Sequence, residues 1–348
     1  MAFLTNTWYV AAWNSDIKNG ELFSRTLLNE KIVFFRNKNK EIQAISDRCP
    51  HRFAPLSMGT HCGNTVQCAY HGLEFDGTGT CTKNPHGDGK IPKAAKVKAY
   101  ITAEKYNLIW LWFGDNNKAD EALIPDFSCM NPELFYVAKG YLHAKANYVL
   151  ETDNILDLSH IQFLHPSTLG GDSDSVSQAI TSLEQQGDTI WSYRQTVNET
   201  MPDFLYNAMG IEHGIPVDRW IDVRWNAPAS MLLFAGATPT GRPRSEGNET
   251  LLPHIFTPET DKTTHYFYSF PMPLAMGEAG AAIAEQQLAG LSIPFTNEDL
   301  PMLEAQQSMI GDEDFWSLKP ILLISDAPGV RARRLLDKMI SDQQIAAV

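Results

Sequence analysis

The stretch from Cys49 to His71 constrains the fold of this chain more than any other part of its sequence. It contains a Cys-x-His pair, Cys49 and His51, and then a Cys-x-x-His pair, Cys68 and His71. Thiolate and imidazole groups are the usual protein ligands of zinc and of some iron–sulfur clusters. Free cysteines and histidines seldom fall into two pairs with metal-ligand spacing, so a chance grouping is a weak explanation. The sequence therefore predicts two loops that hold a metal centre.

Two kinds of metal centre compete for these four residues. A zinc site usually takes both cysteines from one pair and both histidines from the other, whereas here each pair supplies one of each. That mixed arrangement fits a Rieske [2Fe–2S] centre, in which two cysteines hold one iron and two histidines hold the other. The flanking residues, in CPHR and CAYHG, resemble the Rieske signature. We predict a [2Fe–2S] cluster on Cys49, His51, Cys68 and His71, with a structural zinc site as the alternative.

Charge and cysteine usage narrow the class of protein. The net charge of −13 argues against a nucleic-acid partner, because phosphate binding needs clustered Lys and Arg. It leaves room for an electron-donating partner that docks through a basic patch. The cysteines outside the predicted cluster show no pairing plan of the kind found in secreted disulfide frameworks. The N-terminal sequence does not resemble a signal peptide, and no apolar run approaches the ~20 residues of a membrane span. We expect a cytoplasmic protein.

The pattern of strands and helices divides the chain into two regions. Residues 1–115 read as short strands broken by Asn, Gly and Lys clusters, which predicts an antiparallel β domain. The polar stretch 115–127 carries a proline and is expected to be a linker. Residues 116–348 combine aromatic-rich alternating strands with helical patterns, which predicts an α+β fold built from a sheet and helices. The expected helices of this second region lie near 148–164, within 277–307 and near 336–344.

A second group of acidic residues and histidines lies on the first of these expected helices. Asp153, Asp157 and His160 would occupy one face of an α-helix. His165 would lie about 140° around the helix from His160, so both can bind one metal ion only if the helix distorts or ends. Pro166 disfavours helical geometry at the residue before it. We therefore predict a π-bulge or a helix end between the two histidines, a distortion that is common at functional sites.

Two histidines and one carboxylate form the facial triad of non-haem Fe(II) oxygenases, which leaves coordination positions open for O₂. The carboxylate must come from elsewhere, and TNEDLP offers Asp299, which we favour, and Glu298 as the alternative. Asp157 and Asn154 are predicted to be catalytic residues beside the histidines. Asp157 either orients a ligand or links the iron site to a histidine of the cluster. An ordinary amphipathic helix with two satisfied histidines is the structural alternative, and a redox cluster in the same chain weakens it.

CPHR and CAYHGLEF, together with DNILDLSHIQFLH, resemble the oxygenase components of the Rieske non-haem iron oxygenases. Shorter matches run from NTWYVAAW to NEDLPMLEAQQ, so the resemblance covers nearly the whole chain. Within the family, the chain is most similar to the group of vanillate O-demethylase, dicamba monooxygenase and toluenesulfonate methyl-monooxygenase. The resemblance implies a Rieske domain over 1–115 and a catalytic domain of helix-grip type over 116–348. It also implies mononuclear iron ligands at His160, His165 and Asp299.

The same resemblance implies a homotrimer arranged head to tail. In such a trimer the Rieske cluster of one subunit lies near the mononuclear iron of the next, and Asp157 bridges the two sites. One residue departs from a simple helical pattern. Pro301 lies close to the expected carboxylate ligand and is tolerated only in the first turn of a helix. We therefore expect the helix to begin at about Asp299 or to be kinked there.

These features predict a monooxygenase that receives electrons from NAD(P)H through a reductase, with or without a ferredoxin. The expected reaction is O-demethylation of a small aromatic ether acid such as a methoxybenzoate. Hydroxylation of an aromatic methyl group is the alternative. Asn226, Leu233 and Phe234 lie on strands expected to face a cavity and are expected to bind substrate. His254 lies beside apolar residues and is expected to hydrogen-bond a substrate carboxylate or phenol, with a satisfied core histidine as the alternative. An electron carrier that uses only the cluster and a zinc-stabilised binding protein are rival hypotheses, and the second group of ligands argues against both.

Overall fold

The computed structural model describes residues 2–170 and 178–346. Contacts between Cα atoms divide the chain into two compact units. The N-terminal unit runs to Asp126 and includes Glu259–Asp261, and the C-terminal unit consists of Phe127–Pro258 and Lys262–Val348. The stretch 115–127, expected to be a linker, contains two short 3-10 helices. No helix in the described residues is long and apolar enough to cross a membrane.

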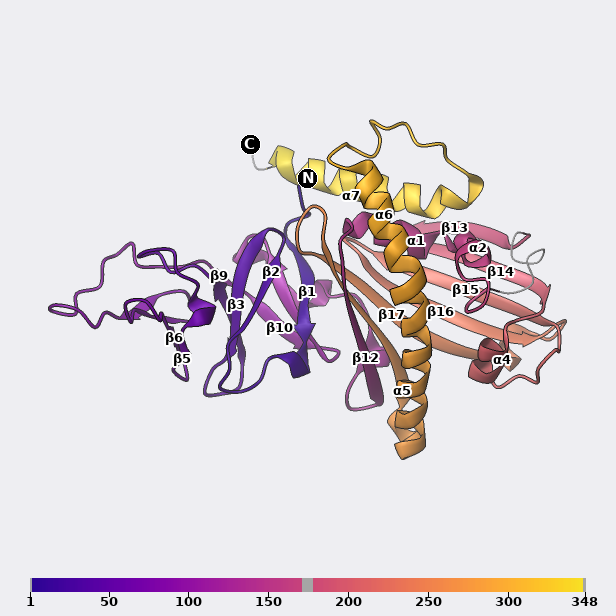
Figure 1. Cartoon of the computed structure of the whole chain (residues 1–348), viewed down its shortest axis with the longest axis horizontal. Helices are drawn as coiled ribbons and strands as arrows, with labels where there is room; N and C mark the ends of the chain where they lie inside the picture. The colour runs from indigo at the N-terminus through magenta and orange to yellow at the C-terminus, as the bar shows by residue number, and fades with distance from the viewer. Residues whose placement is uncertain (1, 171–177, 347–348) are drawn as a thin grey trace. The chain divides into compact units, whose positions relative to one another are not determined.

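The N-terminal unit is built from three antiparallel sheets, in the orders β1-β11-β10, β2-β3-β4-β9 and β5-β6-β7-β8. Figure 1 shows these strands in indigo to magenta. The strands are β1 (Thr7–Trp13), β2 (Phe23–Leu27), β3 (Glu30–Arg36), β4 (Ile42–Ser46), β5 (Thr60–His61), β6 (Thr65–Gln67), β7 (Glu74–Asp76), β8 (Cys81–Lys83), β9 (Ala99–Tyr100), β10 (Thr102–Lys105) and β11 (Leu108–Phe113). The 3-10 helices are η1 (Asn14–Asp16), η2 (Leu56–Met58), η3 (Asn116–Lys118) and η4 (Glu121–Leu123). The β domain expected at the start of the chain is therefore present.

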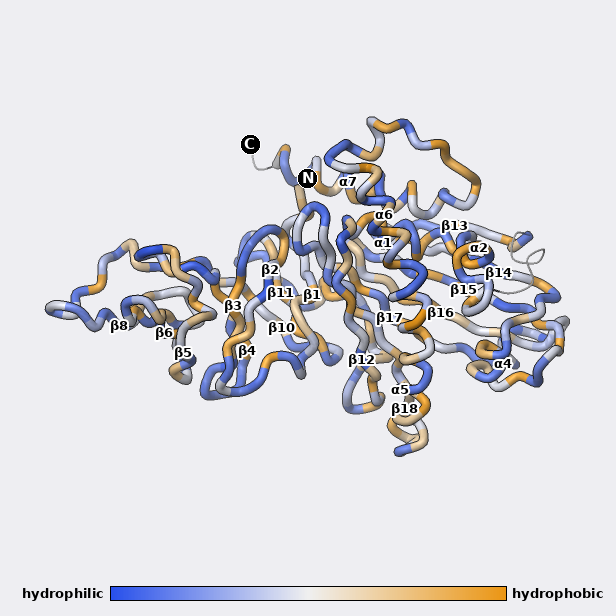
Figure 2. Tube along the Cα trace, viewed as in Figure 1, coloured by the Kyte–Doolittle hydropathy of each residue, from blue (hydrophilic) through white to orange (hydrophobic). Residues whose placement is uncertain are grey.

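The strands of this unit have apolar centres and polar ends, which explains why they pack around a core. The β3 strand places four buried apolar residues between polar ends (Figure 2). Trp110 and Trp112 on β11 are fully buried, as expected for residues of a sheet core. A turn at 76–79 is closed by the Gly79 N–H, which donates to the C=O of Asp76 at 2.9 Å. Gly79 takes φ +77°, a conformation that a residue with a Cβ rarely adopts.

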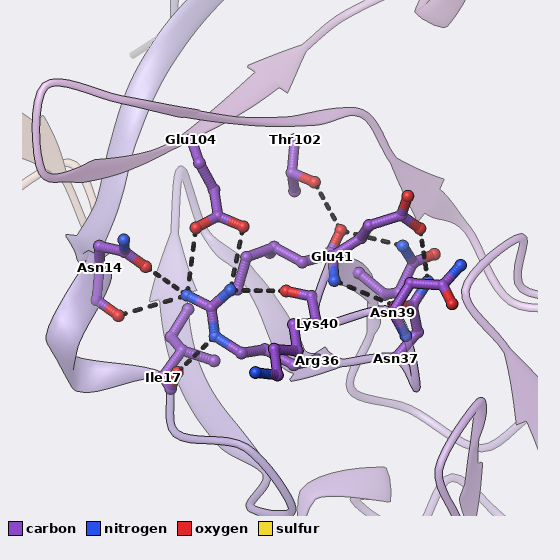
Figure 3. A network of polar contacts seen from close by, with 11 residues as sticks. Asn14, Ile17, Arg36, Asn37, Asn39, Lys40, Glu41, Thr102 and Glu104 are labelled. Atoms are coloured by element: carbon purple, nitrogen blue, oxygen red, sulfur yellow. Dashed lines mark hydrogen bonds and ion pairs between the residues drawn. The ribbon is translucent and has the colours of Figure 1, made fainter.

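Arg36 ties the end of β3 to three other segments (Figure 3). Its Nε donates to the C=O of Ile17 at 2.8 Å, and its Nη1 donates to the C=O of Lys40 at 2.7 Å and to Glu104 at 3.0 Å. The contact with Lys40 lies in the β3–β4 hairpin, whose tip is the turn 37–40. A single guanidinium therefore satisfies one carbonyl group in the hairpin, that of Lys40, and one outside it, that of Ile17.

The C-terminal unit is a seven-stranded antiparallel sheet in the order β12-β18-β17-β16-β15-β14-β13. Its strands are β12 (Phe135–Ala144), β13 (Ile180–Gln186), β14 (Thr189–Glu199), β15 (Val217–Asn226), β16 (Ser230–Pro239), β17 (Asn248–Pro258) and β18 (Thr264–Pro273). These include the alternating segments expected to be strands. Sequence neighbours pair throughout, except that β12 closes the sheet against β18.

Helices pack on this sheet. They are α1 (Tyr148–Leu156), α2 (Ile161–Leu164), α4 (Asp203–Met209), α5 (Gly277–Pro294), α6 (Leu300–Ile310) and α7 (Ala327–Ala346). A π-helical turn, η9 (Phe295–Asp299), joins α5 to α6. Short 3-10 helices are η5 (Ser128–Met130), η6 (Leu158–His160), η7 (Arg244–Glu246), η8 (Leu274–Met276) and η10 (Ile324–Asp326). The long helix α5 contacts β12 and β18, and α1 contacts β17, α6 and α7 (Figure 1). The expected α+β fold is confirmed.

Candidate metal centres

The first cysteine loop closes on itself through two backbone hydrogen bonds. The Cys49 N–H donates to the C=O of Ala54 at 2.9 Å, and the Phe53 N–H donates back to the C=O of Cys49 at 2.9 Å. Phe53 takes φ 60°, a left-handed conformation that is uncommon for a residue other than glycine. The closed loop keeps Cys49 buried and leaves His51 exposed.

The second cysteine loop repeats the same pattern. The Cys68 N–H donates to the C=O of Leu73 at 2.8 Å, and the Gly72 N–H donates to the C=O of Cys68 at 2.9 Å. Gly72 stands where Phe53 stands in the first loop and takes φ 72°. Cys68 is buried and His71 is half-buried. Two loops with the same closure therefore each present one buried thiol and one accessible imidazole.

The four side chains fit a two-iron cluster better than a single zinc ion. Burial raises the pKa of the Cys49 thiol, and the hydrogen-bonded Cys68 thiol raises it further, so two buried thiols lie together where a cation would stabilise their thiolates. The rings of His51 and His71 lie 4.5 Å apart, edge to face. Among the described residues, the set of three possible ligand atoms that all lie within 4.8 Å of one another belongs to His160, His165 and Asp299, not to these four side chains. The ligand atoms of the two loops are therefore farther apart than those of one shared ion, which suits ligands divided between two irons.

The helix expected over 148–164 is broken at Asp157, which corrects the sequence prediction. α1 ends at Leu156, and Asp157 takes φ −114° and ψ 92°. The Asp157 carboxylate accepts the Ser159 N–H at 2.9 Å, so it caps the short helix η6 that follows. Asp153 therefore does not share a helix face with Asp157, and it pairs instead with Arg333 on α7. A second helix end lies at Leu164, within the region where a distortion was expected.

The breaks bring two histidines and one carboxylate together. The Nε2 atom of His165 lies 3.1 Å from Oδ1 of Asp299, and the Nε2 atom of His160 lies 3.5 Å from the same oxygen. The two imidazole rings are 5.2 Å apart and cross at 70°. One ligand atom from each residue lies within 4.8 Å of the others, close enough to share one metal ion. His165 and Asp299 are buried, and His160 is half-buried.

Each histidine also has an acceptor for its other nitrogen. Nδ1 of His160 lies 2.7 Å from the C=O of Asp157, and Nδ1 of His165 lies 2.5 Å from Oε2 of Glu298. Such contacts fix the ring and leave the lone pair of Nε2 for a metal. Burial lowers the pKa of His160. Burial alone would also lower the pKa of His165, but its hydrogen bonds with Asp299 and Glu298 raise it overall.

The π-helical turn η9 positions the carboxylate. The Leu300 N–H donates to the C=O of Phe295, five residues back, which widens the helix by one residue. Asp299 ends this turn, and Pro301 follows in the first turn of α6. The α-helix α6 begins at Leu300, close to the start that was expected at about Asp299, although α5 and η9 precede it without a gap. The expected distortion at Asp299 is present as the π-turn, and Pro301, which has no N–H to donate, is compatible with it.

Asn154 and Glu298 support the same group from two sides. The Asn154 Nδ2 donates to Oδ1 of Asp299 at 3.0 Å. Glu298, considered as the alternative ligand, instead contacts His165, and its Oε2 also accepts the Thr168 hydroxyl at 2.8 Å. Adjacent acidic residues therefore occupy different positions, because the π-turn directs Asp299 toward both Nε2 atoms and Glu298 toward Nδ1.

A cavity of about 110 Å³ lies beside this triad. Its lining is mostly apolar, and its polar residues include the triad, Asn154 and His254. His254 is fully buried, and burial lowers its pKa to about 3, so the ring is neutral. Arg219 also lines the cavity, but Glu199 neutralises it through a buried ion pair at 2.8 Å. The cavity therefore holds no uncompensated cation among the described residues.

Sheet register decides which of the expected substrate residues face the cavity. Leu233 pairs with Leu252, and both line the cavity, as does His254 two residues further along β17. On β15, Arg219 and Ile221 line the cavity, and the pairing with β16 runs without a bulge to Asn226.

Because side chains alternate along a strand, Asn226 faces the other side of the sheet from Ile221. Its amide donates to Thr189 at 2.8 Å. Phe234, next to Leu233, is likewise turned away and packs on Trp191, with ring centroids 5.5 Å apart. The structure therefore does not place Asn226 or Phe234 among the residues that line the cavity.

Three functional contacts have no signal in the sequence. They are the contact of Glu298 with His165, the Glu199–Arg219 pair and a hydrogen bond between His254 and Tyr266. Each joins residues from different elements. The pattern of a single strand or helix therefore cannot reveal them.

Comparisons with known proteins agree with both centres. A family model described as the Rieske [2Fe-2S] domain matches residues 7–100. A second model, described as the vanillate O-demethylase oxygenase C-terminal domain, matches residues 144–342. The matched segments contain the cysteine loops and the triad, respectively.

Whole-chain relatives extend this agreement. The oxygenase component of chloroacetanilide N-alkylformylase from Rhizorhabdus wittichii is 36% identical, over 97% of this chain and 96% of the relative. The oxygenase component of dicamba O-demethylase from Stenotrophomonas maltophilia is 34% identical, over 97% of this chain and 98% of the relative. The crystal structure of dicamba monooxygenase bound to 3,6-dichlorosalicylic acid superimposes with a TM-score of 0.89 at 31% identity and covers 99% of both chains.

Fold and site together define a Rieske non-haem iron monooxygenase. The chain belongs to the family of Rieske oxygenase components that carry the vanillate O-demethylase type of C-terminal domain. The expected cofactors, a Rieske [2Fe–2S] cluster and a mononuclear non-haem iron, are those of this family. The rival hypotheses of an electron carrier and of a zinc-stabilised binding protein are not compatible with this membership.

Proposed function

We propose that the protein removes a methyl group from a small aromatic methyl ether, and that its substrate is an acid of the methoxybenzoate type. The names of its relatives support this proposal, since they include an O-demethylase. The cavity beside the triad supports it as well, because an apolar lining with a few polar groups suits a small aromatic ring. Hydroxylation of an aromatic methyl group, as in a toluenesulfonate, is the alternative.

We assign the cluster to Cys49, His51, Cys68 and His71, and the mononuclear iron to His160, His165 and Asp299. The observation that carries the second assignment is the convergence of two Nε2 atoms on one Asp299 oxygen. When bound, the cluster and the iron supply electron transfer and activation of O₂. Hydroxylation of a methoxy carbon gives a hemiacetal, which releases formaldehyde and leaves a phenol.

The protein residues around the iron hold its ligands in place and orient the substrate. Asn154 keeps Asp299 in place through the hydrogen bond to Oδ1, and Glu298 holds the ring of His165. His254 lines the cavity as a neutral imidazole and is proposed to bind a substrate oxygen. Leu233 also lines the cavity and is proposed to pack against the aromatic ring of the substrate. The mainly apolar walls exclude water from the reacting carbon.

A substrate panel tests the proposed reaction. Methoxybenzoates, neutral methoxybenzenes and toluenesulfonates are supplied with NADH, O₂ and a matching reductase, and formaldehyde and hydroxylated products are measured. O-demethylation predicts formaldehyde in equal amount to a phenol. Benzylic alcohol without formaldehyde would instead establish methyl hydroxylation. Preference for neutral ethers over acids would sink the acid substrate class while keeping the reaction.

We also propose that the protein works in the cytoplasm as a head-to-tail homotrimer, served by a reductase with or without a ferredoxin. Asp157 would bridge the iron site of one subunit and a cluster histidine of the next. Its position supports this role. Its C=O contacts Nδ1 of His160 at 2.7 Å, and both residues line a hollow of about 360 Å³. Light scattering should give the mass of three chains.

Asp157→Asn tests the bridge. Asparagine keeps an acceptor for the Ser159 N–H, so the helix break survives while the negative charge is lost. We expect slower single-turnover electron transfer between the centres, with both irons retained. Asp218→Asn, in the same unit, is the matched control and should transfer at the wild-type rate. A wild-type rate in Asp157→Asn would remove Asp157 from the bridge.

A further inference from the structure

His254 has one occupied nitrogen and one free nitrogen. Its Nδ1 atom lies 2.6 Å from the hydroxyl oxygen of Tyr266 on the neighbouring strand β18. Both residues are buried, and the two rings lie 5.8 Å apart at 25°. Within the described residues, Nε2 of His254 has no hydrogen-bond partner, and His254 lines the cavity beside the triad. The free nitrogen is therefore the one available to a bound molecule.

The environment fixes the number of protons that the pair can share. Burial lowers the pKa of His254 to about 3, so the imidazole is neutral and carries one N–H. Burial, together with the nearby carboxyl groups of Glu151 and Asp299, raises the pKa of Tyr266 well above its usual value. The phenol is therefore protonated. The two groups hold two protons, and the contact at Nδ1 uses one of them.

The hydrogen-bond partners of the two side chains determine where the two protons lie. If Nδ1 carried the imidazole proton, Tyr266 would accept it. The hydroxyl proton of Tyr266 would then be buried without an acceptor among the described residues, at the cost of an unmade hydrogen bond. If Tyr266 donates to Nδ1, the imidazole proton is on Nε2, the nitrogen that is available to a molecule in the cavity that His254 lines. Tyr266 is not among the residues that line this cavity, so its own proton would have no such acceptor. The proton of the pair that stays free for a ligand is therefore the Nε2–H.

We propose that Tyr266 is a positioning residue that holds His254 as the Nε2–H tautomer, so that the cavity offers one N–H donor to its substrate. This inference rests on the proposed function and adds the chemistry of recognition. A matching substrate carries an oxygen acceptor, such as a carboxylate, at the position that reaches Nε2. A molecule with only an alkyl group there would leave the buried N–H unpaired and bind more weakly.

The position of Tyr266 explains why its hydrogen bond with Nδ1 of His254 is rigid. Tyr266 pairs with Phe256, two residues along β17 from His254, so the two side chains are diagonal neighbours on one face of the sheet. The rings of Phe256 and Tyr268 pack on Tyr266, with centroids 4.6 Å and 5.0 Å away. The hydroxyl therefore cannot leave Nδ1 without disturbing packed aromatic residues.

Neutron diffraction from deuterium-exchanged crystals of the complete protein tests the tautomer directly. We expect deuterium on Nε2 of His254 and on the hydroxyl of Tyr266. Deuterium on Nδ1 would overturn the inference, whatever the substrate proves to be. The measurement needs no ligand, so it is independent of the substrate panel.

Binding of a matched pair of probes tests the consequence. The probes are 2-methoxybenzoate and 2-methoxytoluene, which replaces the carboxylate with a methyl group, and binding is measured by calorimetry on iron-loaded protein. We expect Tyr266→Phe to reduce the preference for the acid by roughly tenfold, while iron content stays unchanged. Tyr268→Phe is the matched control. It removes a hydroxyl that contacts Ser292 at 2.8 Å rather than His254, and it should keep the preference.

A third variant separates the two levels of the proposal. If His254→Phe keeps the preference for the acid, the role of His254 in the proposed function fails and the inference falls with it. If His254→Phe abolishes the preference but Tyr266→Phe does not, the inference alone is overturned. If both variants abolish it and the double variant adds nothing, Tyr266 acts through His254, as proposed.

Discussion

The two candidate metal centres are built in opposite ways. The four cluster residues come from one stretch, Cys49 to His71, and two loops with the same backbone closure hold them. The triad joins His160 and His165 to Asp299, which is 134 residues beyond His165 and lies on a π-turn. Local hydrogen bonds shape the first centre. The second depends on the packing of separate helices and on partners such as Glu298 and Asn154.

This contrast predicts how each centre responds to change. A site held by local loops should lose its metal only when a ligand is lost. A site assembled from distant helices should also respond to residues that merely hold its ligands. Substitutions in the two regions therefore test whether the two centres differ in this way.

Cys68→Ala should have the largest effect. Removal of one thiolate from a cluster that needs four protein ligands should bleach the protein. It should also abolish turnover, because no electrons would then reach the mononuclear iron. The visible spectrum and the content of acid-labile sulfide are the measurements. Cys62→Ala changes an exposed cysteine in the same stretch and should leave both unchanged. A normal spectrum in Cys68→Ala would exclude Cys68 as a ligand.

His160→Ala should abolish turnover without bleaching the protein. Loss of a direct ligand should weaken mononuclear iron binding more than roughly 100-fold, the upper range for partners that only support a ligand. Iron analysis should show the cluster irons alone, with an unchanged Rieske EPR signal. His213→Ala, an exposed histidine paired with Asp203 in the same unit, serves as the control. Loss of the cluster in His160→Ala would contradict the separation of the two centres.

Glu298→Gln should give an intermediate effect. The amide can still accept a hydrogen bond from His165, but it lacks the charge that polarises the ring, so iron affinity should fall roughly 10- to 100-fold. Competition with a chelator measures this affinity, and the cluster spectrum should not change. Glu278→Gln, exposed at the start of α5, should behave as wild type. Equal iron affinity in both variants would mean that the mononuclear centre, like the cluster, depends on its direct ligands alone.

The same contrast explains how much could be predicted from the sequence. Cys49, His51, Cys68 and His71 lie close together in the chain, so their spacing alone indicates a cluster. A break between His160 and His165 was predicted from helical geometry, and α2 ends there at Leu164. The earlier break at Asp157 was not predicted, because it depends on a capping contact with Ser159 that competes with the helix.

Residues of the sheet show the limit of such prediction. Leu233 and His254 face the cavity, whereas Asn226 does not, and the difference is one of strand parity. A register shift of one residue reverses every side chain, and no single strand reveals its own register. Tyr266 was missed for a related reason, because its contact with His254 runs diagonally between two strands.

Substitution of Glu151 should have the smallest effect, a change in how the stability of the protein depends on pH. It is fully buried on α1, and its Oε1 has no hydrogen-bond partner among the described residues. Burial, and then repulsion from Asp299 and Glu304, raises its pKa from 4.5 to about 8. The folded protein therefore binds this proton more tightly than the unfolded chain does. Its stabilising effect is complete below pH 4.5 and is lost as the pH rises to about 8.

Glu151→Gln should remove this pH dependence, because the amide keeps the shape and cannot ionise. We expect the melting temperature of the wild type to fall by a few degrees more than that of the variant between pH 5.5 and pH 8.5, with Glu212→Gln, an exposed residue, as the control. Iron bound beside Asp299 adds positive charge, lowers the pKa of Glu151 and should reduce the difference. If the difference in melting temperature between the wild type and the variant is the same with and without iron, burial alone raises the pKa of Glu151. The mononuclear centre would then be less coupled to its surroundings than its contacts imply.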